Sequence, residues 1–382
     1  MHHTETPHHR NYAYLILFFI SVIPVLAVYT PFALKWNTVW GIPLGESSMQ
    51  VIFTNWDGPN YVYNAITNYV PDAINRTPFL NVAAYYPAHF PGISWALMPF
   101  AAIMGYYYGS FALQLLTGFI ANSIFFHFIK PHTRHALWLT LMFTLLPPRI
   151  LAVRSVFGPE LLMIGCIIGG LMAWEHKRYV FAGLFTFFAV TLKFQALVLP
   201  AAMIAHIVWM ALIQKKPLPV RSLIAPLFGI SGYALIAWFY GLQTGNPHAY
   251  FTAQQIAGLQ TALPFSMFNF SQKWVGTGHM EAAALYFIGL FATTIALYQQ
   301  KRQSVFWIFT FAYTVMLSLI PQVDIMRLAL PVAPLTLFAF RDTFSSKLFR
   351  LTLIASLPVI YLYTINFIIR NQAPITIWSL FR

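Results

Sequence analysis

The sequence predicts an all-α protein that crosses a membrane about eleven times. Three observations support this class: 59% of the 382 residues are hydrophobic, 8% are charged, and apolar runs long enough to span a bilayer recur throughout. One soluble core could not bury so much apolar surface. We therefore expect a single integral-membrane domain over residues 1–382.

Charge and cysteine content exclude several function classes. The single cysteine, Cys166, lies in an apolar run, so a disulfide framework or a thiolate metal site cannot form. The net charge is +13, but Lys and Arg cluster in short connections between apolar runs, as orientation signals do. Membrane topology therefore explains the basic composition, and no nucleic-acid partner is expected.

The first apolar run predicts an uncleaved span. Residues 1–10 are too polar for a signal sequence, and residues 12–29 contain no small-residue cleavage site. The positions of the other spans depend on residues 85–108, which are apolar but interrupted by prolines. If these residues crossed the membrane, the basic connections would lie opposite Arg10, against the positive-inside rule. We therefore expect residues 85–108 to lie along the outer interface.

This choice fixes the topology. The N-terminus is then cytoplasmic, the C-terminus is outside, and two long extracytoplasmic loops cover residues 32–109 and 242–280. The first loop should contain interfacial helices, and the active site is expected on this extracytoplasmic face. Several spans are short for a bilayer, so tilt is expected. The expected spans cover residues 12–31, 110–129, 136–153, 159–174, 179–193, 196–213, 222–242, 281–298, 304–320, 328–340 and 351–369.

Charged side chains then gather on the outer side. Of the nine acids, Glu5, Glu175 and Asp342 face the cytoplasm. The outer acids are Glu46, Asp57, Asp72, Glu160, Glu281 and Asp324. The basic residues near outer span ends or in outer loops are Lys35, Arg76, Arg149, Arg154, Lys193, Lys273 and Arg327. Cations at membrane depth are costly unless an anion such as a phosphate ester binds them. Alternatively, lipid headgroups or the same acids pair with them.

Five short blocks stand in order along the chain. They are residues 56–61 (WDGPNY), 85–91 (YYPAHFP), 157–160 (FGPE), 191–195 (TLKFQ) and 245–254 (GNPHAYFTAQ). A later Arg327 precedes Pro331 and Pro334. In order and content these blocks resemble motifs of the GT-C glycosyltransferases, and most closely of the PIG-V-like mannosyltransferases. The resemblance runs from about residue 50 to residue 335, with departures: Glu160 lacks its usual hydroxyl neighbours, Lys193 stands near a usual Arg, and Asn246 replaces an acid.

The resemblance implies a hexosyltransferase. It would move a hexose, with mannose as the family precedent, from a polyprenyl-phosphate donor to an acceptor hydroxyl, with inversion. Such a transfer needs a carboxylate that takes the acceptor proton, and we assign Asp57 as this base. Alternatively, Asp57 is a helix N-cap or turn residue followed by Gly58-Pro59.

Cations would stabilise the leaving phosphate. The candidates are Lys193 and Arg327, followed by Arg154 and Arg149, although the last two could instead snorkel to the interface. The candidates for binding the sugar or the acceptor are Trp56, Tyr61, Glu160, His89, Gln195 and Asn246. Glu160 could equally favour a helix N-terminus, a lone His is often structural, and Tyr and Trp concentrate at membrane interfaces.

No cofactor is expected, because the Asp, Glu and His residues show no metal-ligand spacing; a divalent cation would have to be bound from distant loops. The expected partners are the polyprenyl-phosphate-sugar donor, membrane lipids and an acceptor that is a glycolipid, a glycan or a protein. Three alternatives stay open: a polysaccharide polymerase or ligase, a transporter of lipid-linked sugar, and a scaffold. A transporter would usually show repeat symmetry and ionisable residues deep in its spans.

Overall fold

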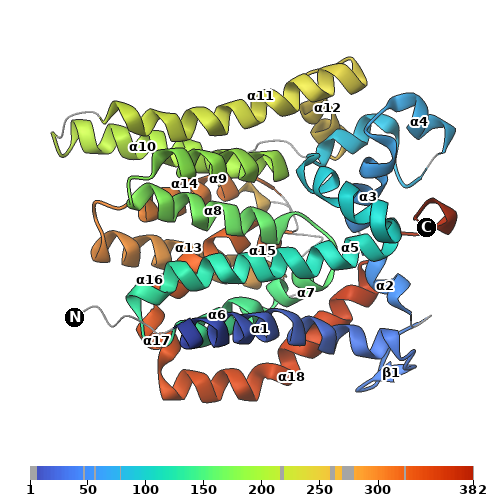
Figure 1. The fold of residues 1–382 in the computed structure, drawn as a ribbon, viewed down its shortest axis with the longest axis horizontal. Helices are drawn as coiled ribbons and strands as arrows, with labels where there is room; N and C mark the ends of the chain where they lie inside the picture. The colour runs from blue at the N-terminus through green and yellow to red at the C-terminus, as the bar shows by residue number, and fades with distance from the viewer. Residues whose placement is uncertain are drawn as a thin grey trace.

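Long helices run side by side between two ends of a bundle (Figure 1). The computed structural model describes residues 7–45, 48–55, 57–77, 79–215, 219–258, 263–268, 279–321 and 324–381. Glu46, Trp56 and Lys273 therefore lie outside the described residues. The only sheet in the described part is a hairpin of β1 (Thr38–Val39) and β2 (Ile42–Pro43), with Thr38 opposite Pro43. The predicted all-α class is confirmed.

The helices follow the apolar runs. The longer ones are α1 (Pro7–Ala33), α5 (Gly92–Ile129), α8 (Glu160–Glu175), α9 (Tyr179–Leu192), α10 (Val198–Leu212), α11 (Ile224–Thr244), α13 (His279–Gln300), α14 (Val305–Ser318) and α18 (Lys347–Arg370). The shorter ones are α2 (Met49–Phe53), α3 (Gly58–Thr67), α4 (Pro71–Arg76), α6 (Ala136–Leu145), α7 (Arg149–Ser155), α12 (Ala249–Ile256), α15 (Ile325–Leu328), α16 (Ala333–Ala339) and α17 (Arg341–Ser345). Short 3₁₀ turns are η1 (Ala83–Ala88), η2 (Lys130–His132), η3 (Phe194–Leu197), η4 (Val220–Leu223), η6 (Leu330–Val332) and η7 (Trp378–Phe381).

Within the described residues, six helical segments are long and apolar enough to cross a membrane. A seventh is obtained if the bent pair α6 and α7 is one span. Further apolar helices of 10 to 17 residues coincide with predicted spans at Tyr179–Leu192, Val305–Ser318 and Ile325–Ala339. The protein is thus an integral multi-pass membrane protein, while the count of eleven spans stays a prediction.

The span expected at residues 136–153 is not a straight helix. It is divided into α6 and α7, which are bent by 79°. Pro147 and Pro148 stand between the two helices. Proline lacks the amide hydrogen that a helix needs and its ring clashes with the preceding turn, so two consecutive prolines end α6. The bend places α7, with Arg149 at its start, close to the end of the bundle that carries the short helices.

A kink at Gly105 divides α5 into two arms. After η1 the chain enters α5 at Gly92, but Gly105 has φ 74° and ψ 163°, a conformation that glycine reaches easily and that no helix uses. A Cβ on Gly109 would lie 3.1 Å from the Ala101 nitrogen, so the two arms of α5 double back against each other. Placement of the first arm along a membrane interface stays a prediction.

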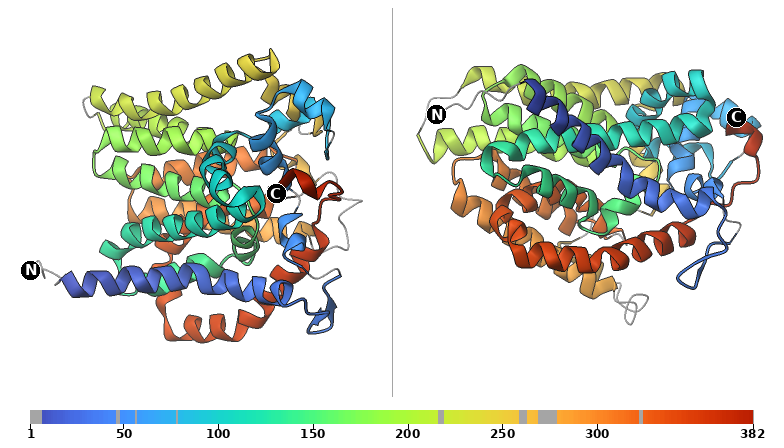
Figure 2. Two further views of the ribbon diagram at one scale, coloured as in Figure 1. Left: turned by 45° about the vertical axis from the view of Figure 1, so that its right-hand side comes forward. Right: turned by 60° about the horizontal axis from the view of Figure 1, so that its bottom comes forward.

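The basic connections gather at the end of the bundle that bears the N-terminus. The Ser304 hydroxyl donates to Glu175 Oε1 at 2.8 Å, and Arg341 Nη1 donates to Gln300 Oε1 at 3.0 Å. The Trp138 indole donates to the Phe344 carbonyl at 3.0 Å. Helix ends from different parts of the sequence therefore meet there (Figure 2). The predicted topology needs this arrangement, but which side of the membrane this end faces stays a prediction.

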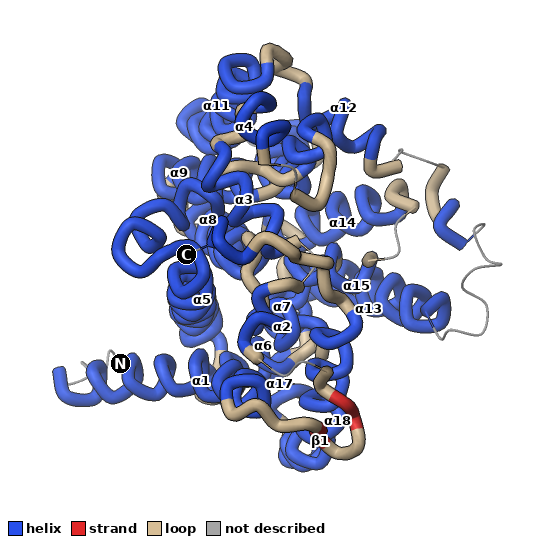
Figure 3. Tube along the Cα trace, turned by 90° about the vertical axis from the view of Figure 1, so that its right-hand side faces the viewer, coloured by secondary structure: helices blue, strands red, loops and turns tan. Residues whose placement is uncertain are grey.

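The opposite end, called the loop end below, carries α2, α3, α4, η1, α12 and the C-terminal segment (Figure 3). Buried tyrosines fix its backbone. The Tyr69 hydroxyl donates to the His89 carbonyl at 2.6 Å, and the Tyr240 hydroxyl donates to the Pro87 carbonyl at 3.0 Å. Because Tyr240 belongs to α11, these bonds attach the segment after η1 to the helical bundle and hold His89 in place.

Candidate active site

Asp57 stands directly before α3, where Gly58 and Pro59 begin the helix. Its side chain makes no capping hydrogen bond, although it occupies the N-cap position. The carboxylate instead pairs with the guanidinium of Arg327, through Oδ2 and Nη1. A Cβ on Gly58 would lie 3.2 Å from the Phe157 carbonyl oxygen, so glycine allows α3 to approach the segment that leads into α8. This approach brings Asp57 into the bundle.

Arg327, in the short helix α15, is the centre of the charged cluster. Besides Asp57, its Nε donates to Glu160 Oε1 at 2.8 Å and its Nη2 lies 2.5 Å from the same oxygen. Asp324, one helical turn earlier, lies 3.7 Å from Arg327 Nη1. Arg327 therefore connects three carboxylates that come from three distant parts of the chain.

Glu160 holds the second cation of the cluster. Lys193, which follows the last residue of α9, donates from Nζ to Glu160 Oε1 at 2.7 Å. The Glu160 side chain is 4% exposed, and two cations offset the cost of burying its charge. A Cβ on Gly158 would lie 2.5 Å from Glu160 Oε2, so the glycine makes room for this carboxylate.

His89 completes the group around Asp57. Its Nε2 lies 3.8 Å from Asp57 Oδ1, and its ring packs edge-on against Tyr61 with centroids 5.0 Å apart. The Nδ1 atom is buried without a hydrogen-bond partner among the described residues. The space between Nε2 and Oδ1 is wider than a hydrogen bond, so both atoms can contact one hydroxyl group placed beside them.

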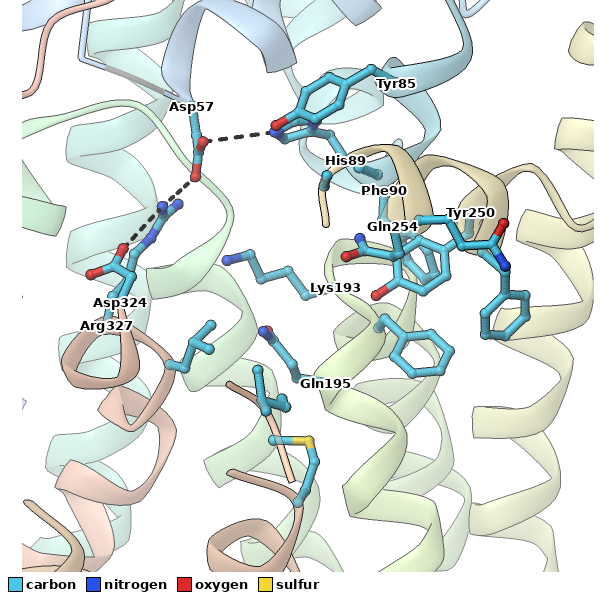
Figure 4. A pocket seen from close by; sticks show the side chains of 18 of the residues that line it. Asp57, Tyr85, His89, Phe90, Lys193, Gln195, Tyr250, Gln254, Asp324 and Arg327 are labelled. Atoms are coloured by element: carbon cyan, nitrogen blue, oxygen red, sulfur yellow. Dashed lines mark hydrogen bonds and ion pairs between the residues drawn. The ribbon is translucent and has the colours of Figure 1, made fainter. Parts of the chain in front are cut away.

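These residues border a cavity of about 720 Å³ at the loop end (Figure 4). One wall is charged and is formed by Asp57, Asp324, Lys193, Arg327 and His89. Amide and aromatic groups from η3 and α12 also line the cavity: Gln195, Tyr250, Gln254 and Gln255, with Tyr250 and Gln254 across from Asp57 and Arg327 in Figure 4. Apolar side chains complete the lining with Met316, Leu319, Ile320, Leu328, Phe194 and Phe251. The cavity therefore combines charged groups, groups able to bind hydroxyls, and apolar side chains.

Electrostatics keep Asp57 ionised. Burial raises the pKa of its carboxyl group, but the charge of Arg327, the nearby His89 and the charge of Lys193 together outweigh burial. The pKa of Asp57 is thus held well below its usual range. With Arg327 bound, Asp57 is a weak proton acceptor.

Most of the site residues predicted from the sequence meet here. Asp57, Tyr61, His89, Lys193, Gln195 and Arg327 all line the cavity. Glu160 does not line it but lies behind Lys193 and Arg327, where it positions both cations. Its expected contact with a sugar stays a prediction.

Arg149 and Arg154 do not line the cavity. Arg149 pairs with Asp324 and stacks over the Phe367 ring at 3.8 Å, so it supports the charged wall from behind. Arg154 is 1% exposed, and its Nη2 donates to Asn122 Oδ1 at 2.5 Å. The structure thus places Arg154 within the helical bundle. The fold does not bring it to the cavity with Lys193 and Arg327, the cations with which it was grouped from the sequence.

Asn246 also lies away from the cavity lining. Its Oδ1 accepts from the His248 amide at 2.9 Å, and its Nδ2 donates to Thr252 Oγ1 at 3.3 Å. These are the bonds of a turn that connects α11 to α12. The fifth block thus positions α12, whose Tyr250 and Gln254 reach the cavity.

Sequence reasoning missed Asp324, Gln254 and Gln255 as site residues. Asp324 stands three residues before Arg327, a spacing that places both on one face of a helix, so its position was a usable signal. Gln254 belongs to the fifth block. Gln255 had no such signal, because the cavity faces α12 only through the tertiary fold.

The absence of a metal cofactor stays a prediction. Among them, no group of three or more His, Cys, Asp or Glu side chains is placed to hold a metal ion. Asp57 and Asp324 both contact Arg327, which already compensates their charge. No step proposed below uses a metal.

Comparison with known proteins shows the fold. No family model matches the chain, and no curated protein matches its sequence. Among solved structures it is similar to the Archaeoglobus fulgidus oligosaccharyltransferase in complex with Zn and sulfate, with 16% identity and a TM-score of 0.50 over 93% of this chain and 53% of that chain. For the apo form of the same protein the values are 14%, 0.50, 94% and 56%. The chain thus spans about half the length of these structures.

The chain therefore shares its fold with this oligosaccharyltransferase. The sequence identity is low, so the likeness carries the fold alone. Membership of the GT-C superfamily and the PIG-V-like specificity both stay predictions.

Proposed function

We propose that the protein is a glycosyltransferase that moves a hexose from a polyprenyl-phosphate donor to an acceptor hydroxyl. The observation that supports this proposal best is the shared cavity, in which Asp57 faces Lys193 and Arg327. An inverting transfer needs a carboxylate on one side of the anomeric carbon and cations on the other. Mannose is the first sugar to test, because the sequence blocks resemble those of mannosyltransferases.

The proposed reaction is a direct displacement. The acceptor hydroxyl, held between Asp57 Oδ1 and His89 Nε2, attacks the anomeric carbon and gives its proton to the Asp57 carboxylate. The bond from the anomeric carbon to the phosphate oxygen breaks, and its electron pair leaves with the phosphate. Lys193 and Arg327 stabilise the charge on that phosphate, while Glu160 keeps both cations in position.

The other walls suggest where the rest of the donor binds. Amide groups of Gln195, Gln254 and Gln255 can donate to and accept from sugar hydroxyl groups. The apolar lining at Met316, Leu319 and Ile320 suits the isoprenoid next to the phosphate. The acceptor is a glycolipid, a glycan or a protein, and the site is proposed to face the extracytoplasmic side, with the N-terminus in the cytoplasm.

The test is sugar transfer by the purified protein in nanodiscs. Polyprenyl-phosphate mannose is supplied with a panel of lipid, glycan and peptide acceptors, and wild type is compared with Asp57→Asn. We expect Asp57→Asn to lose about 10²- to 10⁴-fold in rate, the contribution of general base catalysis. Asp72→Asn, an exposed acid in α4, is the matched control.

Three results contradict parts of the proposal. Full activity of Asp57→Asn removes Asp57 from the mechanism. An equal loss in Asp72→Asn indicates an unspecific effect of charge on the loop end. The third result is that wild type transfers no sugar from any polyprenyl-phosphate donor but extends or ligates a lipid-linked polysaccharide. The polymerase or ligase alternative then replaces the hexosyltransferase.

A further inference from the structure

The charged wall of the cavity, together with Arg149 and Glu160 behind it, has balanced charges. Three cations (Arg149, Lys193, Arg327) and three carboxylates (Asp57, Glu160, Asp324) alternate in contact with one another. Within the described part of this wall, no Arg or Lys is left without a carboxylate. An anionic phosphate that binds here must therefore displace a carboxylate from its cation. Otherwise the site has an excess of negative charge, which weakens binding.

Asp57 is the carboxylate that can yield. Glu160 is nearly buried and bonded to two cations, so its release would leave an unpaired charge in the bundle. Asp57 is 21% exposed, lines the cavity, and has one cation within direct contact. Water or a substrate hydroxyl can solvate its carboxylate once it leaves Arg327.

Arg327 is built for such an exchange. Its Nε and Nη2 stay on Glu160, whereas Nη1 contacts Asp57 and points into the space between Asp57 and Asp324 (Figure 4). A guanidinium can thus keep its bond to Glu160 and offer Nη1 to a phosphate oxygen. Lys193 lines the same cavity and bonds Glu160 with one of its three N–H groups, so it can provide the second contact.

We infer that Arg327 exchanges partners: its Nη1 binds Asp57 in this structure, and when the donor binds, a phosphate oxygen replaces the Asp57 carboxylate at Nη1 while Nε and Nη2 stay on Glu160. Asp57 is then released as a base only in the donor complex, so the donor binds before the acceptor hydroxyl is activated. This inference rests on the proposed function.

The consequence is an unusual effect of Asp57 substitution on the affinity for phosphate. Asp57 competes with the phosphate for Arg327, so removal of its charge must strengthen phosphate binding. A residue that contacts the donor favourably would weaken binding when substituted. The same exchange removes the cation that keeps Asp57 a weak proton acceptor, and the carboxylate becomes a stronger base at the moment when a sugar is present.

The test measures binding of polyprenyl phosphate without sugar to the full chain in nanodiscs, by titration of intrinsic tryptophan fluorescence. Compared with wild type, we expect Asp57→Asn to bind about tenfold tighter, which corresponds to about 1.4 kcal/mol. Asp57→Ser, a second variant without charge, should change in the same direction. Arg327→Gln should bind about tenfold weaker, and Asp72→Asn should match wild type.

Unchanged or weaker binding by both Asp57 variants, with Asp72→Asn equal to wild type, overturns the exchange. A neutral polyprenol separates this failure from failure of the proposed function. If wild type binds the phosphate no better than the polyprenol, the phosphate site itself is wrong. If wild type prefers the phosphate and transfers sugar but the Asp57 variants bind no tighter, the function stands and the exchange of Arg327 does not.

Discussion

Glu160→Gln is the most informative perturbation of the charged wall. The substitution keeps the shape of the side chain but removes the charge that two cations share, with Lys193 Nζ at 2.7 Å and Arg327 Nη2 at 2.5 Å from Oε1. Arg327 retains Asp57 and Asp324, whereas Lys193 loses the carboxylate to which it is bonded. The main cost is therefore an uncompensated ammonium group.

Breaking a buried ion pair from one side costs about 3–5 kcal/mol. The Lys193 side chain is 15% exposed to the cavity, where water can solvate it, so the lower end, about 3 kcal/mol, applies. At about 2 °C per kcal/mol for a large chain, the unfolding midpoint should fall by about 6 °C. The assay is thermal unfolding in detergent followed by tryptophan fluorescence, with Asp72→Asn as the control of equal charge change.

A double variant sharpens this prediction. In Glu160→Gln with Lys193→Met, the unpaired ammonium is gone, so the double variant should be more stable than Glu160→Gln alone. Two results would refute the reasoning. One is a midpoint for Glu160→Gln that equals that of Asp72→Asn, and the other is a double variant whose two destabilisations simply add.

Three further predictions concern pH, the buried arginine and helix contact. Because the folded-state pKa of Asp57 lies below its unfolded value of about 4, its contribution to stability is present above that pH and lost below it. The difference in unfolding midpoint between wild type and Asp57→Asn should thus be constant from about pH 7 to 5 and shrink below about pH 4; a difference that grows on acidification contradicts the pairing. Arg154→Met should change the binding free energy of polyprenyl phosphate by less than about 0.5 kcal/mol, since Arg154 bonds Asn122 and Gly118 within the bundle. A large loss of affinity in the same binding titration would show that Arg154 belongs to the donor site. Gly58→Ala should cost about 1–3 kcal/mol of stability, because the new Cβ meets the Phe157 carbonyl oxygen at 3.2 Å, and thermal unfolding with no measurable change would show that α3 can move away.

Helix positions were largely predictable. In lipid, the backbone N–H and C=O groups of an apolar run must form intrahelical hydrogen bonds. The limits of the apolar runs therefore located α9, α11 and α14 within a few residues. The exception at residues 136–153 arose because hydropathy averages over the two prolines that end α6. The five blocks, which carry the resemblance to GT-C glycosyltransferases, contain most of the residues that line the cavity.

Pairing within the site required the tertiary structure. The sequence by itself determined that this is a helical membrane protein and that Asp57, Lys193 and Arg327 are candidates for a common site. It could not separate Arg154, whose charge is bonded within the bundle, from Arg327, whose charge faces the cavity. Nor could it show that Glu160 supports two cations while Asp57 stays accessible. Burial and partner choice depend on which helices pack together, and those contacts join residues far apart in sequence, where local pattern carries no information.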